Sequence, residues 1–173
     1  DELKKMYIFD GNTEFDIFVM EKPNVNLTDG SMTKDGIHIL FGLKVDYRIQ
    51  LLIRENLINL LAKDIDIPIT NSWESVLDAG ISKGSTNWTL YGSRKPENEA
   101  YELTYQWRVK FDPKDNEFEM NEFDVKQFSV MDNFDLLSVR NTTRPSYPLR
   151  PEYEVRQKET KPKAVIQNCE NAD

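Results

Sequence analysis

The chain has 173 residues, enough for one domain with its own hydrophobic core, so folding does not require disulfides or a structural metal. A formal net charge of −8 argues against a basic surface that binds nucleic acid by counterion release, although a local basic site stays open. Cys169 is the only cysteine and has no internal disulfide partner, which favours a reducing compartment.

The sequence shows no pattern of a membrane span or a secretory signal. No stretch approaches the roughly 20 apolar residues that cross a bilayer. The N-terminal sequence DELKKMYIFDG lacks the basic start and apolar centre of a signal peptide. We therefore expect a soluble, intracellular protein without membrane contact. Because Asp1 is not a methionine, we also expect the sequence to be a piece of a longer polypeptide.

Two strands are predicted near the N-terminus. Residues 14–21, EFDIFVME, alternate and then become continuously apolar, as a strand with a buried face does. Pro23 ends this strand because it cannot donate to a ladder, and the polar stretch 24–33 is typical of a loop. Residues 34–42, KDGIHILFG, predict a second strand, antiparallel to the first.

The most regular helical pattern covers residues 45–62, where apolar side chains recur at steps of three and four. The helix is predicted to stop soon after, because the next stretch, DIDIP at 64–68, alternates and ends in a proline. Its D-x-D pair resembles a metal-binding motif, but acids are common in such loops, and we interpret it as a loop. Residues 70–74 offer capping side chains for a short helix before Asp78.

Aromatic and β-branched residues favour strands over 87–92 and 101–111, which we expect to pair as a hairpin with a long turn. The region 117–141 has no decisive periodicity, and its structure stays open. Prolines and charges dominate the remainder of the chain. We therefore predict a folded domain over residues 1–142 and a linker or tail over residues 143–173.

His38 is the only histidine, and it lies within the second predicted strand. A lone histidine in a strand is most often a structural residue. Here alternation places Lys34 and Gly36 on the same face, with Ile37 and Ile39 directed into the core. Glycine leaves room for a bulky anionic ligand, and lysine and histidine donate hydrogen bonds to phosphate oxygens. The spacing therefore indicates a phosphate site.

Two further stretches carry charged groups of interest. Asp78 stands among apolar and small residues, where a carboxylate needs a partner such as a divalent cation, although a surface turn explains it equally well. Ser93, Arg94 and Lys95 could form a second phosphate clamp, although such runs are usually solvated turns. Base stacking and core packing both explain the aromatic residues of the later strand, Tyr101, Tyr105 and Trp107.

Taken together, KDGIHILFG, the following helix and the segment NSWESVLDAGISKGSTNWTLYGSRKPENEAYELTYQW resemble the primase domain of primase-helicases of nucleocytoplasmic large DNA viruses, the poxvirus and mimivirus type, in the archaeo-eukaryotic primase superfamily. The resemblance covers about Phe15 to Arg140. It implies an α/β (α+β) domain with a mixed or antiparallel sheet flanked by helices. It also implies DNA-templated primer synthesis by two-metal nucleotidyl transfer, with Mg²⁺ or Mn²⁺ as cofactor.

The same resemblance implies roles for individual residues. The small-x-His motif of the superfamily resembles Gly36-Ile37-His38, which makes His38 a catalytic residue that contacts the triphosphate of the incoming nucleotide. The final acid resembles Asp78, which becomes a catalytic metal ligand. A basic residue that PrimPol members carry falls on Lys95. The implied nucleotide-binding residues are Lys34, Gly36, His38, Ser93, Arg94 and Lys95.

The sequence departs from the family pattern in places. Gly36 stands where relatives carry serine, and Thr89 replaces an arginine found in some members. The early D-x-D or D-x-E pair is missing upstream of His38, so we expect these acids on the parent polypeptide before Asp1. Because two-metal chemistry needs about three carboxylates, the fragment alone is expected to bind nucleotide weakly and not to polymerise.

The implied partners are nucleoside triphosphates, a single-stranded DNA template and a helicase domain of the same polypeptide, with the parent a homo-hexamer. The implied location is the host cytoplasm or a viral replication factory, with the nucleus as an alternative. Two other functions stay open. One is a non-catalytic nucleic-acid or partner-binding module that keeps the primase fold, and the other is an unrelated metal-dependent nuclease, which the Lys-x-Gly-x-His face fits less well.

Overall fold

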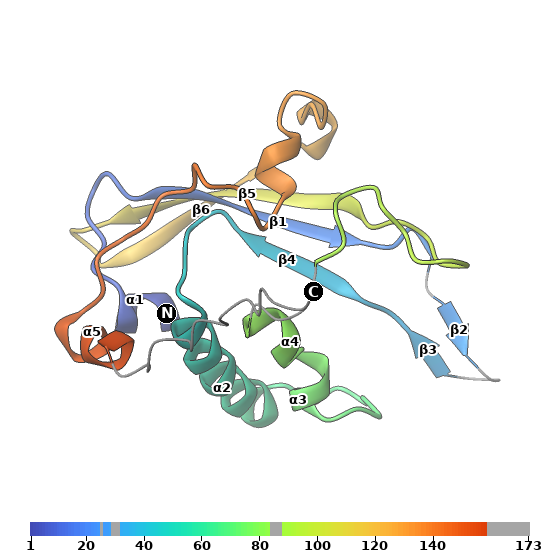
Figure 1. Ribbon diagram of the computed structural model, residues 1–173, viewed down its shortest axis with the longest axis horizontal. Helices are drawn as coiled ribbons and strands as arrows, with labels where there is room; N and C mark the ends of the chain where they lie inside the picture. The colour runs from blue at the N-terminus through green and yellow to red at the C-terminus, as the bar shows by residue number, and fades with distance from the viewer. Residues whose placement is uncertain (25, 29–31, 84–87, 159–173) are drawn as a thin grey trace, which may run out of the picture.

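Strand β1 lies inside a four-stranded antiparallel sheet and pairs on both sides, in the order β4-β1-β5-β6 (Figure 1). The computed structural model describes residues 1–24, 26–28, 32–83 and 88–158. The strands of this sheet are β1 Glu14–Glu21, β4 Ile37–Phe41, β5 Glu102–Asp112 and β6 Glu117–Phe123. The sheet confirms the predicted α+β class, and it is antiparallel throughout.

One face of the sheet carries a core that two short 3-10 helices cover. Alternation along β1 places Phe18 and Met20 on this face, where they pack against Leu40 of β4 and Leu137 of η2. The two covering elements are η1 Val125–Gln127 and η2 Phe134–Leu137. They belong to the region whose structure the sequence left open.

The α-helices α2, α3 and α4 lie on the opposite side of the sheet (Figure 1). The predicted long helix is confirmed as α2, which begins where the Asp46 carboxylate accepts a hydrogen bond of 2.9 Å from the Arg48 N–H. Ile49 of α2 packs against Met6 and Leu149. The α-helices are α1 Glu2–Met6, α2 Tyr47–Asp64, α3 Trp73–Val76, α4 Ala79–Ser82 and α5 Pro151–Lys158.

The orientation of β4 differs from the prediction. Ile37 and Ile39 were expected in the core, but their side chains are 56% and 52% exposed, whereas Leu40 is only 5% exposed. The prediction was wrong because the pairing register sets the buried face. His38 lies opposite Met20, and directly opposed residues of an antiparallel pair point to the same face. His38 therefore shares the face of the buried core.

The predicted hairpin between 87–92 and 101–111 is also wrong. The later segment forms β5, but β5 pairs with β1 and β6, and residues 88–92 form no strand. Position 87 lies outside the described residues. The Leu103 N–H instead donates a hydrogen bond of 3.2 Å to the Tyr91 hydroxyl, beside an irregularity in the β1–β5 register. Residues 88–100 therefore cross the sheet end as a loop.

The stretch predicted as a loop at 24–33 contains a small ladder. Its two strands, β2 Asn26–Thr28 and β3 Met32–Lys34, pair antiparallel. The polar composition of this stretch hid the ladder, because three-residue strands show too little alternation to be recognised. Positions 25 and 29–31 lie outside the described residues. As predicted, the first two main strands, β1 and β4, are antiparallel neighbours.

Packing continues beyond residue 142. Leu149 is buried and forms an antiparallel bridge with Tyr7, and the Arg150 N–H donates a hydrogen bond of 2.8 Å to the Met6 carbonyl. Arg144 donates to the Ser138 carbonyl at 2.7 Å. The first residues of the predicted tail are therefore held against the N-terminal helix. Cys169 lies outside the described residues.

No helix in the described part of the chain is both long enough and apolar enough to cross a membrane.

The observed orientation of β4 predicts unequal costs for two neighbouring substitutions. Leu40→Ala should lower the free energy of unfolding by about 2–5 kcal/mol, because it leaves a cavity in the core. Ile39→Thr keeps a β-branched side chain at an exposed position and should cost about 1 kcal/mol or less. Urea unfolding followed by tryptophan fluorescence measures both. Equal costs, or a larger cost for Ile39→Thr, would contradict the register.

Candidate functional site

The imidazole of His38 lies in an aromatic environment at the edge of the sheet. The Tyr101 ring stacks on it with a centroid distance of 3.7 Å and an interplanar angle of 15°. Trp88 packs against the same imidazole at 4.5 Å, tilted by 52°. Because Tyr101 occupies one face of the imidazole, a ligand has to reach His38 through the ring edge, where its nitrogens lie.

Two lysines surround this aromatic group. Lys22 lies 5.7 Å from the centre of the Tyr101 ring, within the range of a cation–π contact, and donates a hydrogen bond of 3.1 Å to the Asn98 side chain. Burial lowers the pKa of His38, and the positive charges of Lys22 and Lys95 lower it further. The imidazole is therefore neutral at physiological pH, with one nitrogen that donates and one that accepts.

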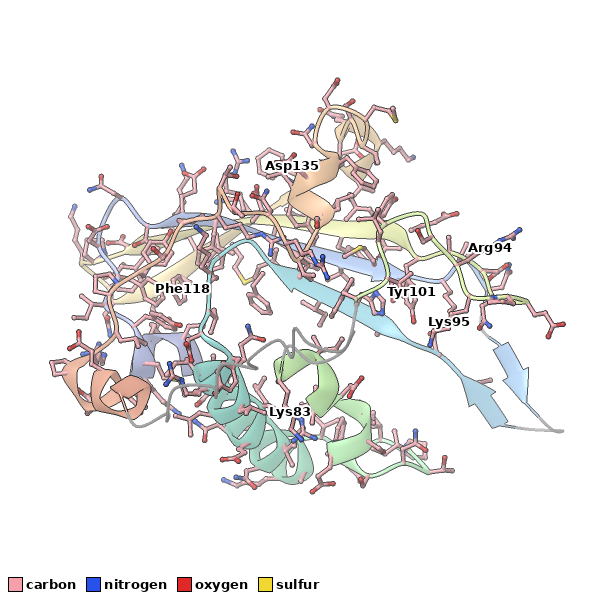
Figure 2. All side chains as sticks on the ribbon, in the orientation of Figure 1. Lys83, Arg94, Lys95, Tyr101, Phe118 and Asp135 are labelled. Atoms are coloured by element: carbon pink, nitrogen blue, oxygen red, sulfur yellow. The ribbon has the colours of Figure 1, made fainter. Side chains whose placement is uncertain are left out.

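Residues 93–99 form a charged turn with two basic and two acidic side chains, and Figure 2 shows Arg94 and Lys95 at the same end of the sheet as Tyr101. The turn lines an open hollow of about 540 Å³ that Arg94, Lys95 and Glu97 share with their neighbours. It is anchored to the segment after β1, because Asn24 donates two hydrogen bonds to the Glu99 carboxylate, at 3.0 and 2.7 Å. Ser93 is exposed, and its N–H donates to the Leu90 carbonyl at 2.9 Å, which closes the preceding turn over residues 90–93.

Gly36 lies directly beside Tyr101. A Cβ atom at position 36 would stand 2.6 Å from the Tyr101 hydroxyl oxygen, a distance that real Cβ contacts do not show. The space beside Gly36, for which the sequence pattern predicted an anionic ligand, is filled by Tyr101.

Lys34 belongs to a different ladder from His38. It ends β3 and pairs with Asn26, and residues 35–36 separate it from β4. The uninterrupted alternation expected from Lys34 to His38 is therefore broken, and the side chain of Lys34 lies outside the described part of the structure.

Asp78 lies in the helical layer, away from the face that carries His38 (Figure 1). Its exposed carboxylate caps α4 by accepting a hydrogen bond of 2.7 Å from the Gly80 N–H. The preceding carbonyl, of Leu77, accepts a bond of 2.5 Å from Arg54 of α2. Among the described residues, no three His, Cys, Asp or Glu side chains gather into a metal-binding group.

The structure thus brings together His38, Gly36 and Lys95, and it adds Lys22, Trp88 and Tyr101. Asp78 does not join them. The sequence pattern did not predict a role for Lys22, because Lys22 follows β1 and comes near His38 only when the chain is folded. Tyr101 was noted for its aromatic character, but its partner could not be identified, because strand alternation relates residues within one segment and says nothing about contacts between segments.

The lowered pKa of His38 predicts a pH-dependent stability. As pH falls below the ordinary histidine value of 6.5, the unfolded chain takes up a proton before the folded one. The contribution of neutral His38 to the free energy of unfolding is therefore fully present above pH 6.5. It decreases as the pH falls toward the pKa of His38 in the folded state. NMR titration of this single histidine gives its pKa, and urea unfolding between about pH 7.5 and 5.5 should show a slope that His38→Gln removes. A histidine pKa at or above 6.5 would contradict the buried environment.

Comparison with known proteins matches residues 1–107 to a protein family, the C962R protein N-terminal AEP domain, where AEP denotes the archaeo-eukaryotic primase type. The chain is also similar to a protein of Acanthamoeba polyphaga mimivirus that is named as a helicase. The two are 38% identical over 98 residues, which are 54% of this chain but 10% of that relative. The family match covers most of the chain, including β1, β4 and the His38 site. The chain belongs to the C962R N-terminal AEP domain family, whose domain is of the archaeo-eukaryotic primase type.

Proposed function

We propose that this domain binds the triphosphate of an incoming nucleotide and thereby takes part in DNA-templated primer synthesis by its parent protein. The observation that carries the proposal is the convergence of Lys22, Lys95 and the His38 imidazole at one end of the sheet. Family membership supports it, because an archaeo-eukaryotic primase domain is a nucleotidyltransferase type of domain.

The chemistry of this group suits phosphate oxygens better than a nucleobase. Lysine and arginine side chains form charge-assisted hydrogen bonds to phosphate, and Arg94 and Lys95 extend from an exposed turn that a ligand can reach. A neutral imidazole adds one N–H donor without repelling the lysines. Stacking a base on His38 would require displacement of Tyr101, which already covers that face.

Nucleotidyl transfer by two metal ions needs about three carboxylates. The described residues do not fit that requirement, because Asp78 caps α4 and no acidic cluster surrounds it. We retain Asp78 as one proposed ligand for Mg²⁺ or Mn²⁺, with the other carboxylates supplied from outside the described residues. Under this proposal the chain binds nucleotide but does not extend a primer by itself.

The partners belong to the same proposal. A relative that is named as a helicase, and of which the matched stretch is only 10%, supports a helicase domain in the same polypeptide. A single-stranded DNA template and a hexameric parent follow from the family resemblance. An intracellular viral replication site follows from it as well, whereas a division of the chain at residue 142 follows from the change in composition there; all four remain predictions.

The site predicts that triphosphate binding depends on three side chains. His38→Ala, Lys95→Ala and Lys22→Ala should each weaken binding of ATP roughly tenfold or more, since a hydrogen bond to a charged group contributes about 1.5–3 kcal/mol. Isothermal titration calorimetry on the whole chain at low ionic strength measures this. Lys114→Ala is the matched control, because it removes an exposed lysine from the β5–β6 turn, in a different part of the sheet.

The same titrations separate phosphate recognition from base recognition. Inorganic tripolyphosphate should compete with ATP for the site, whereas adenosine should not, because the face of His38 is covered. Asp78→Asn should leave the affinity for tripolyphosphate in the absence of metal unchanged, because Asp78 caps α4 in the helical layer. Equal losses for Lys114→Ala and Lys95→Ala, or competition by adenosine alone, would refute a triphosphate site.

A further inference from the structure

We propose that Tyr101 is a positioning residue that holds the His38 imidazole edge-on to the triphosphate, and that Gly36 is required because its missing side chain gives the Tyr101 hydroxyl its place. This inference rests on the proposed function, since it assigns the residue that orients the central donor of that site. Tyr101 itself touches no phosphate under this proposal, because its ring lies flat against the imidazole.

The stacking geometry supports this role. The rings of Tyr101 and His38 are nearly parallel at a centroid distance of 3.7 Å, while Trp88 holds the imidazole from a tilted direction. A tilt of the imidazole plane away from the Tyr101 ring would break this parallel stack. Aromatic pairs in contact contribute about 0.5–1.5 kcal/mol beyond the area they bury, which is enough to favour one ring orientation over its alternatives.

Two neighbours, Gly36 and Lys22, fit around the Tyr101 side chain. Its hydroxyl oxygen occupies the space where a Cβ of residue 36 would stand, at 2.6 Å, whereas its ring atoms would be no closer than 3.7 Å to that Cβ. Lys22 lies over the Tyr101 ring, held in place by Asn98. Burial raises the pKa of the Tyr101 phenol, so the hydroxyl stays protonated and adds no charge beside the phosphate site.

This geometry makes a specific rescue possible. In Gly36→Ala the new methyl group collides with the hydroxyl oxygen alone, so the Tyr101 ring has to move and its stack with His38 is disturbed. Tyr101→Phe removes that oxygen and keeps the ring. The double variant Gly36→Ala with Tyr101→Phe should therefore restore the stack, because the nearest remaining ring atom stands at an ordinary contact distance of 3.7 Å.

The experiment measures the ring protons of the single histidine by NMR, together with tripolyphosphate affinity, in the whole chain. Ring currents from Tyr101 make the His38 signals report the stack directly. Gly36→Ala should shift these signals, raise the histidine pKa toward 6.5 by exposing the imidazole between Lys22 and Lys95, and weaken binding. We expect a loss of roughly threefold to tenfold, within the range of coupling between residues in contact. The double variant should recover both properties.

Two controls keep the result decisive. Gly11→Ala is a matched glycine substitution, because its nearest neighbour would be Pro113 at an ordinary 3.7 Å, and it should leave the His38 signals unchanged. Tyr101→Leu keeps an apolar side chain but removes the ring, and it should shift the signals even if Gly36→Ala lowers folding yield. The proposal is overturned if Gly36→Ala and Tyr101→Leu leave the His38 signals in place, or if the double variant remains as impaired as Gly36→Ala.

The two readouts distinguish this inference from the function on which it rests. Rescue of the His38 signals decides whether Tyr101 and Gly36 position the imidazole. If the signals follow the expected pattern while the wild-type chain binds no tripolyphosphate, the positioning of the imidazole stands and the proposed triphosphate site is refuted. If the double variant restores the His38 signals but not the affinity for tripolyphosphate, Tyr101 does not act on binding by positioning His38.

Discussion

The pairing of β4 with β1 is the constraint on which the rest of the site depends. Met20 stands opposite His38 and Phe18 stands opposite Leu40, so these four residues share one face of the sheet. A slip of the register by one residue would exchange the faces and bring Ile37 and Ile39 inside. Burial of Phe18, Met20 and Leu40 with Leu137 favours the observed register strongly, because it places apolar side chains in a continuous core. The position of His38 is a consequence of that packing.

The site then arises where this buried face reaches the edge of the sheet. His38 is half-buried, at the border between the core and the loop 88–100, and Trp88 and Tyr101 pack against its imidazole. The lysines that join it come from widely separated parts of the sequence. Hydrogen bonds from Lys22 to Asn98 and from Asn24 to Glu99 attach the end of β1 to the turn 93–99. Lys22 and Lys95 both act on His38, although the chain as a whole carries a net charge of −8.

Hydrogen bonds within the helical layer hold Asp78 and the segment before it. Its carboxylate is already engaged with the start of α4, and the segment before it is attached to α2 through Arg54. The Gly80 N–H and the Arg54 side chain thus hold Asp78 in the helical layer, which lies on the other side of the sheet from the face that carries His38. Asp78 and the group around His38 are therefore separate in space within the described residues.

The sequence by itself determined the elements whose signals are local. Alternation over residues 14–21, the three- and four-residue spacing in α2 and the motif around His38 were sufficient for β1, for the helix and for the family resemblance. Tertiary structure decided which face of β4 is buried, that residues 88–92 form a loop, and that Tyr101 stacks on His38. The physical reason is that these outcomes depend on contacts between distant segments. Propensity and alternation describe one segment at a time, whereas the register against β1, the closure of the loop and the collision at Gly36 exist only once the segments have packed.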